Sequence, residues 1–376
     1  MHRPVSRTTV LLFAVLLSAL LAACARRPNA PAPHPEPIAA PAKSPCTASK
    51  ERTIGEGHVV GNLTVYPITS CAQADVGPIV TLDEALEKGT AIIREVEGGG
   101  SVNTLVIENK GAVPVFVLAG TIVKGGRQDR QIGQDYLIGG KDKSDVDAFC
   151  VEHGRWNESR DGEKTGGVFR VADVIATSKV RAAGQYEKDQ GKVWSKVAAA
   201  NKAHAKAPPS ETLLATVDDA ALVKEREALA ERLERALATV APRESLVGFA
   251  YALDGEIKGA RWFAHHRLWA MHEKKLLRSV ALEATTAIAE AKASGKPLKP
   301  SAPPPPPSAV ETFVASVETG EVKEERETKA ENVNEYQESA KAFGSKMKMK
   351  TKPSSKSSGA KGSPAKKALS GDVTAK

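Results

Sequence analysis

The sequence predicts an α+β fold in which an N-terminal, antiparallel β-rich part packs with C-terminal helices and a β-hairpin. Two observations predict this class. Short segments rich in Val and Ile, separated by Gly, Asn and Pro, fill the first half of the domain, whereas amphipathic helical periodicity dominates the second half. Runs of strands followed by runs of helices are typical of α+β proteins. We also expect disordered linkers at both ends of the domain.

The strands predicted for the first half are short and close together in sequence. A capping box at Thr81-Leu-Asp-Glu84 predicts a short helix that ends at Gly89, because glycine adopts the left-handed conformation at little cost. Strands are expected at 61–68, 90–96, 102–108, 115–118, 136–138 and 146–151.

The second half of the domain predicts helices and one hairpin. Residues 182–205 have helical composition, and a second helix follows from an apolar stripe formed by Leu222, Leu229, Leu233, Leu237 and Val240. Asp254-Gly255 predicts a two-residue turn between strands at 246–253 and 256–263, because these residues adopt positive φ angles. A last amphipathic helix is expected at 265–292, burying Leu268, Trp269, Leu276, Val280 and Ala284.

The first 24 residues have the parts of a lipoprotein export signal. A basic start with Arg3 and Arg7 precedes an apolar run at 9–21, and Leu-Ala-Ala stands directly before Cys24. The run is too short for a membrane-spanning helix, which needs about 20 residues. We expect residues 1–23 to be a cleaved signal peptide and Cys24 to carry the lipid that anchors the chain to a membrane. An uncleaved N-terminal helix is the alternative.

The residue after this cysteine bears on localisation. Ala25, where an Asp would favour the inner membrane, favours the outer membrane of the bacterial cell envelope. The domain is then expected to face the periplasm or the cell surface.

Two segments flank the domain, which we place at 51–295. Residues 24–50 are rich in Pro and Ala and predict an extended spacer. Residues 296–376 begin with prolines and continue into a charged, Lys-rich tail. We expect this segment to be disordered, except that a short helix at 310–317 is compatible with its sequence. The net charge of +8 belongs to residues 345–376, which contain nine Lys and one Asp. The rest of the chain is neutral overall, so no specific nucleic-acid binding is expected.

Three cysteines remain if Cys24 is lipidated. Cys46 and Cys71 flank the start of the domain and are candidates for a disulfide in an oxidising compartment. Cys150 lies in the apolar run 146–151 and is then expected to be a buried thiol.

The first candidate ligand site is the segment from Lys124 to Arg130. Its two glycines expose backbone N–H groups, and its three cations can bind a phosphate or carboxylate. It lacks the Gly-Lys-Ser/Thr ending of a P-loop. The alternative is a solvated turn whose charges pair with Asp129 and Asp135. The candidate ligand-binding residues are Lys124, Gly125, Gly126, Arg127, Gln128 and Arg130.

The second candidate site is Cys150-Val-Glu-His-Gly-Arg-Trp156, at the end of a predicted strand. Glu152 and His153 are candidates for acid/base catalysis, and His153, Arg155 and Trp156 for ligand binding. Strand alternation places Cys150 and His153 on opposite faces, which disfavours a nucleophile pair. The structural alternative is that Trp156 fills the sheet while Arg155 pairs with Glu152.

No metal or cofactor is expected. His265, His266 and His272 lie near one another but lack the acidic or cysteine spacing of a zinc motif. Their pattern predicts solvated helix surface.

Several segments, in this order, resemble the ARPP-1 domain family, a domain associated with ADP-ribosylglycohydrolase and rhodanese/phosphatase proteins. They cover about residues 55–285 and are 61–68, 81–89, 101–109, 124–130, 150–156, 190–194 and 247–281. Where other members carry an acidic pair after a glycine, this chain has Gly120-Thr-Ile122, and a Gln often replaces His153. The resemblance implies at most a link to nucleotide-derived or phosphorylated ligands.

These observations predict an envelope lipoprotein whose domain binds an anionic ligand with the two basic segments in one cleft. Cations and glycines converge without an evident nucleophile or metal set, so enzymatic activity is not the leading expectation. The alternatives are a hydrolase of a phosphate or ADP-ribose linkage, with Glu152 and His153 as acid and base, and a scaffold that binds a partner protein.

Overall fold

The fold comes from a computed structural model, which describes residues 52–96, 103–160, 163–240, 242–295, 303–350 and 368–376. The predicted signal peptide, Cys24, Cys46 and the predicted spacer 24–50 lie outside the described residues. The described part contains helices and strands in comparable amounts, which confirms the α+β class. In this part of the chain, every helix is too short or too polar to cross a membrane.

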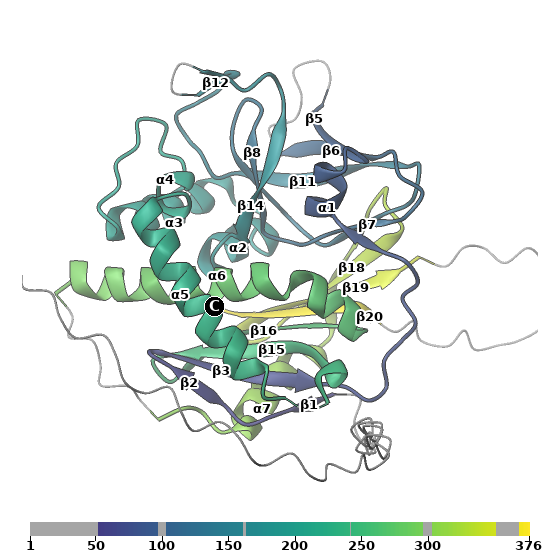
Figure 1. Cartoon of the computed structure of the whole chain (residues 1–376), viewed down its shortest axis with the longest axis vertical. Coiled ribbons are helices and arrows are strands. Elements are labelled where there is room, and N and C mark those ends of the chain that lie inside the picture. The colour runs from purple at the N-terminus through teal and green to yellow at the C-terminus, as the bar shows by residue number, and fades with distance from the viewer. Residues whose placement is uncertain (1–51, 97–102, 161–162, 241, 296–302, 351–367) are drawn as a thin grey trace, which may run out of the picture. The chain divides into compact units, whose positions relative to one another are not determined.

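A large antiparallel sheet combines strands from three distant parts of the chain (Figure 1). Its order is β1-β3-β15-β16-β20-β19-β18-β17, with β2 also paired to β3. The strands are β1 (Thr53–Ile54), β2 (His58–Val60), β3 (Leu63–Thr69), β15 (Leu246–Leu253), β16 (Glu256–Phe263), β17 (Val322–Glu327), β18 (Asn332–Glu338), β19 (Ala342–Met349) and β20 (Ala368–Ala375).

The predicted hairpin lies at the centre of this sheet. Strands β15 and β16 pair in antiparallel register from Gly248 opposite Trp262 to Leu253 opposite Glu256. Asp254 and Gly255 have φ angles of 48° and 79°, as the turn requires. The Asp-Gly prediction is confirmed at both strand ends.

A second, six-stranded antiparallel sheet contains the candidate site. Its order is β14-β8-β9-β11-β6-β5. The strands are β5 (Ala91–Glu95), β6 (Thr104–Asn109), β8 (Thr121–Gly125), β9 (Arg130–Ile132), β11 (Lys143–Cys150) and β14 (Phe169–Ile175). Two smaller sheets consist of β4 (Val80–Thr81), β7 (Val115–Val117) and β10 (Tyr136–Ile138), and of β12 (Ser159–Arg160) and β13 (Glu163–Lys164).

The helices cover both faces of the large sheet (Figure 1). Helix α6 lies between β15 of this sheet and β14 of the six-stranded sheet, and α5 packs against α6. Helix α7 packs on the other face, where Val310, Val314 and Val317 join Tyr66 and Trp262. The helices are α1 (Leu82–Glu87), α2 (Ser178–Gln185), α3 (Gln190–Ala203), α4 (Leu214–Val217), α5 (Ala220–Leu237), α6 (His266–Ala293) and α7 (Pro307–Glu318), with a 3₁₀ turn at Arg243–Ser245.

Local sequence signals account for several of these helices. The Thr81 hydroxyl accepts the Glu84 N–H at 3.1 Å, and Gly89 follows the helix end at φ 66°, as the capping box predicts. The residues predicted to face inward on α6 are all buried. The segment expected to be helical at 182–205 is two helices, α2 and α3, because Lys188 between them adopts a positive φ of 53°.

The prediction of a disordered tail is wrong for residues 303–350 and 368–376. These residues form α7 and four strands of the large sheet, whereas 296–302 and 351–367 lie outside the described residues. The short helix allowed at 310–317 is confirmed as part of α7.

The composition of the tail predicts disorder because the segment is polar. The segment folds nevertheless, because its polar side chains have buried partners elsewhere in the chain. On β20, Ser370 donates to Asp135 Oδ2 at 2.6 Å, and Asp372 accepts from Tyr186 Oη at 2.6 Å and pairs with Arg181. Arg261 donates to both oxygens of Asp135 at 2.7 and 2.6 Å. A buried charge is tolerated when it is paired and hydrogen-bonded, so these strands need few large apolar residues of their own.

The prediction of solvated helix surface is wrong for His272. Its ring is buried, with ring centroids 5.3 Å from Phe116 and 5.5 Å from Phe263. Burial, and then the charges of Lys275 and Arg261, lower the pKa of His272 to about 3. The imidazole is therefore neutral in the folded protein at ordinary pH.

We expect His272 to make the protein less stable in mild acid. His272 takes up a proton near pH 6.5 in the unfolded chain and only near pH 3 in the folded protein. The free energy of unfolding therefore has its full value above pH 6.5 and falls as the pH is lowered toward 3. The slope is about 1.4 kcal/mol per pH unit. His272→Phe is expected to remove a loss of about 2 kcal/mol between pH 7 and pH 5, measured by urea unfolding. The same loss in variant and wild type would contradict this assignment.

Candidate functional site

The first basic segment is a β-hairpin and not an open loop. Strands β8 and β9 pair through Ile122 with Gln131 and Val123 with Arg130, and residues 126–129 connect them. Gly125 and Gly126 have φ angles of 134° and 48°. A Cβ on Gly125 would lie 2.0 Å from Val168 O, and one on Gly126 would lie 2.2 Å from the Phe169 ring. The glycines are therefore required for close contact with the start of β14.

Three backbone N–H groups of this hairpin donate to carboxylates of the protein itself, and the Gly126 N–H donates to Val168 O at 3.4 Å. Gly125 N–H donates to Asp129 Oδ1 at 3.0 Å, Arg127 N–H to Glu95 Oε1 at 3.2 Å, and Asp129 N–H to Glu152 Oε2 at 2.9 Å. These three amides therefore have acceptors inside the protein, whereas the sequence analysis expected them to point toward a ligand.

The two basic segments do meet, through Arg155. Its Nε and Nη2 donate to both oxygens of Glu152 at 2.9 and 2.8 Å. Its Nη1 also donates to Gly126 O at 2.8 Å, and Nη2 donates to Gly125 O at 3.2 Å. Arg155 and Glu152 are buried. Their pairing, the structural alternative raised by the sequence, is confirmed, and Arg155 has a positioning role here because its donors are already used.

Arg130 is also buried but is less completely bonded. Its Nη2 lies 2.9 Å from Glu95 Oε2, and its Nη1 donates to Thr104 O at 3.5 Å. Its Nε and Nη2 make no hydrogen bond of good geometry with a described residue, and its side chain also interacts with the thiol of Cys150 on the neighbouring strand. The guanidinium carbon lies 5.9 Å from the centroid of the Trp156 ring, within the range of a cation–π contact.

The remaining residues of the two segments have varied environments. Trp156 is 46 % exposed, so the structural alternative that it fills the sheet is wrong for this residue. Arg127 is partly exposed, and its guanidinium forms no ion pair with a described residue. Lys124 pairs with Asp218 at 3.1 Å, and the buried Gln128 amide donates to His153 O at 3.4 Å.

The two candidate catalytic residues are separated by their contacts. Both oxygens of Glu152 are held by Arg155, whereas His153 Nδ1 lies 2.6 Å from Glu211 Oε2 on the surface. The His153 ring also packs against Trp194 at 4.4 Å between centroids. Sequence reasoning missed Glu211 as the partner of His153, because 58 residues separate them and no local spacing connects them.

The cysteines agree with the predicted environments as far as they are described. Cys150 is buried and forms no disulfide, and burial raises the pKa of its thiol. Cys71 is disulfide-bonded, and its partner lies outside the described residues. Within the described ranges, no cluster of three or more His, Cys, Asp or Glu side chains is arranged to hold a metal ion.

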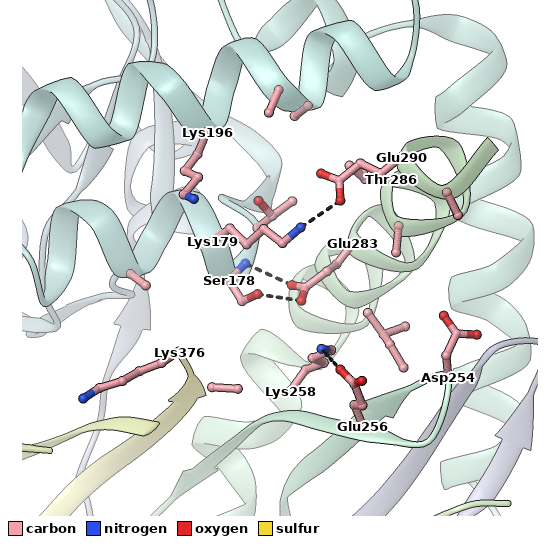
Figure 2. Close-up of a pocket in the computed structure, with 18 of the residues that line it drawn as sticks. Ser178, Lys179, Lys196, Asp254, Glu256, Lys258, Glu283, Thr286, Glu290 and Lys376 are labelled. Atoms are coloured by element: carbon pink, nitrogen blue, oxygen red, sulfur yellow. Dashed lines mark hydrogen bonds and ion pairs between the residues drawn. The ribbon is translucent and has the colours of Figure 1, made fainter. Parts of the chain in front are cut away.

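A cavity of about 770 Å³ lies elsewhere, between α2, α3, α6 and the β15–β16 turn (Figure 2). Ser178 donates to Glu283 through its N–H and its hydroxyl, at 2.9 and 2.6 Å. Lys179 donates to Glu290 at 2.7 Å (Figure 2). None of the residues singled out in the two basic segments lines this cavity. Its charged side chains largely neutralise one another, so its lining suggests no single ligand charge.

Comparisons with known proteins place the chain in one family. Residues 51–354 match the model of ARPP-1, the ARG and Rhodanese-Phosphatase-superfamily-associated Protein domain. This match includes α7 and β17 to β19, which the sequence analysis had placed outside the domain. No curated protein and no solved structure matches the chain. Because the family model covers most of the sequence, the chain belongs to the ARPP-1 family, which is associated with ADP-ribosylglycohydrolase and rhodanese-phosphatase proteins.

Proposed function

We propose that this ARPP-1 domain binds a small anionic ligand, phosphate-bearing or nucleotide-derived, at Arg127, Arg130 and Trp156. The main support is Arg130, a buried guanidinium whose Nε and Nη2 form no hydrogen bond of good geometry with the described residues, although Nη2 lies 2.9 Å from Glu95 Oε2. Leaving buried donors unsatisfied costs free energy, and hydrogen bonds to a charged group recover about 1.5–3 kcal/mol each. A phosphate oxygen at this position would supply the missing acceptor.

Arg127 and Trp156 extend this site toward solvent. Arg127 has no ion-pair partner among the described residues and is partly exposed, so its guanidinium is available to an incoming phosphate. The half-exposed Trp156 ring beside Arg130 offers a face on which a nucleotide base can stack. Glu152 and Arg155 support the site by holding the two segments together.

Arg127→Ala is expected to weaken binding of ADP-ribose and inorganic phosphate about tenfold, because one charge-assisted hydrogen bond is lost. Isothermal titration calorimetry on the purified full-length protein measures this. Arg235→Ala is the matched control, since Arg235 is an exposed arginine on α5. The Arg235→Ala protein is expected to bind both ligands with the affinity of the wild type.

Two outcomes would contradict the proposal. Equal affinity of Arg127→Ala and wild type would place the ligand elsewhere. Heat that continues after saturation and disappears in His153→Ala would indicate turnover, and would favour the hydrolase alternative over a binding protein.

We further propose that lipid on Cys24 holds this domain at the cell envelope, more specifically at the outer membrane. The support is the export signal that ends in Leu-Ala-Ala-Cys24. Cells fed radiolabelled palmitate are expected to label the wild-type chain, and Cys24→Ser is expected to lose the label entirely. A labelled Cys24→Ser chain would contradict the attachment site.

A further inference from the structure

Three carboxylates contact the β8–β9 hairpin, and one of them differs from the other two. Asp129 and Glu152 are completely buried. The side chain of Glu95 is 24 % exposed and lies at the last residue of β5, an edge strand of its sheet. Of the three, Glu95 is therefore the one that can leave with the least disturbance of the core.

Glu95 contacts the same two arginines that the proposed site uses. Its Oε1 accepts the Arg127 N–H at 3.2 Å, and its Oε2 lies 2.9 Å from Arg130 Nη2. An arginine fork is best satisfied by two parallel N–H···O bonds from adjacent nitrogens. Glu95 does not achieve this, because Nε and Nη2 of Arg130 both lack an acceptor in hydrogen-bonding geometry within the described residues.

We infer that Glu95 is an internal counter-ion which occupies the ligand's anion position and is displaced by a phosphate group on binding. This inference rests on the proposed function. A tetrahedral phosphate has several ionised oxygens, so it can accept from Arg130 and from the Arg127 amide at once. The ligand class is therefore a terminal phosphate or diphosphate, and Glu95 lowers the affinity of the ligand-free protein for it.

The displacement predicts that removing the charge of Glu95 improves binding. Glu95→Gln has nearly the same shape, forms no ion pair with Arg130 and does not repel an incoming anion. We expect it to bind inorganic phosphate and ADP about tenfold more tightly than the wild type. Glu95→Asp keeps the charge but is one methylene shorter, and a smaller gain is expected because it reaches Arg130 less well.

Calorimetry with the full-length chain tests this, with inorganic phosphate and ADP as the probes. Glu108→Gln is the matched control, because Glu108 lies on neighbouring β6 and pairs with Arg94 at 3.3 Å on the surface. Its affinity is expected to be unchanged. Thermal unfolding of each variant checks that it is folded. If Glu95→Gln is not folded, Glu95→Asp provides the test.

The outcomes separate this inference from the proposed function. If the Glu95 variants bind the probes more tightly than the wild type and Glu108→Gln does not, both the inference and the proposed function are supported. If the wild type binds and the Glu95 variants bind equally or more weakly, Glu95 is not a competitor, and the inference fails while the binding function remains. If neither the wild type nor any Glu95 variant binds either probe, both fail.

Discussion

Replacing Asp372 by alanine is expected to lower the free energy of unfolding by about 3–5 kcal/mol, because it leaves buried cations without their partner. Asp372 is buried on β20, where it pairs with Arg181 and accepts from the Tyr186 hydroxyl. Burial alone would raise the pKa of Asp372, but Arg181 and Arg261 outweigh it and hold the pKa below its ordinary value. Its contribution is therefore present at neutral pH and is lost as the pH falls through the lowered pKa.

Urea unfolding followed by circular dichroism measures this loss. Asp145→Ala is the matched control, since Asp145 pairs with Lys329 on the surface, and its loss is expected to stay below about 1 kcal/mol. A loss of similar size for both variants would contradict the ordered C-terminal strand. It would support the disordered tail that composition predicts.

Glu152→Ala is expected to be nearly as destabilising, at about 3–5 kcal/mol, because Arg155 stays buried without its carboxylate. Both oxygens of Glu152 accept from Arg155, and Oε2 also accepts from the Asp129 N–H at 2.9 Å. Without Glu152, the contact between the two basic segments is weakened, so ligand binding should be lost together with stability.

The same unfolding experiment checks this second prediction. Glu231→Ala is its control, because Glu231 on α5 is exposed and lies 3.8 Å from Arg235. Its effect is expected to stay below about 1 kcal/mol. A Glu152→Ala protein as stable as Glu231→Ala would show that Arg155 finds another partner, and the positioning role of the pair would be wrong.

Local signals in the sequence were sufficient where a few neighbouring residues determine the structure. The Asp-Gly turn, the capping box at Thr81 and the apolar stripe of α6 each involve residues within one or two turns of chain. Backbone preferences and side-chain periodicity act at that range, so these elements were predicted with ends that differ by at most a few residues.

Long-range polar pairing explains the main errors. The strands at 322–327 and 368–375 lack an apolar alternating pattern, and distant residues stabilise both. Strand 368–375 contacts Asp135 and Arg181, and strand 322–327 contacts Lys188 and the Gln185 carbonyl. From composition alone, these polar residues are expected to be exposed to solvent. His272 was misassigned for a related reason, because Phe116 and Phe263 enclose its ring from other elements.

The candidate site was predicted in part. The segments around Arg127 and Arg155 come together, as expected, and Arg155 pairs with Glu152, as the structural alternative stated. The internal anion Glu95 could not be identified, because it lies 35 residues before Arg130 and appeared only as the end of a predicted strand. The sequence therefore did not reveal that internal carboxylates already contact the amides and the Arg130 guanidinium of this hairpin.

The most direct test of the anion site is a crystal structure of the full-length protein with ADP-ribose. We predict a phosphate within about 3.5 Å of both Arg127 and Arg130, with Glu95 turned away and the adenine against Trp156. ADP-ribose bound only in the cavity between α2, α3 and α6, with Glu95 still beside Arg130, would contradict the account.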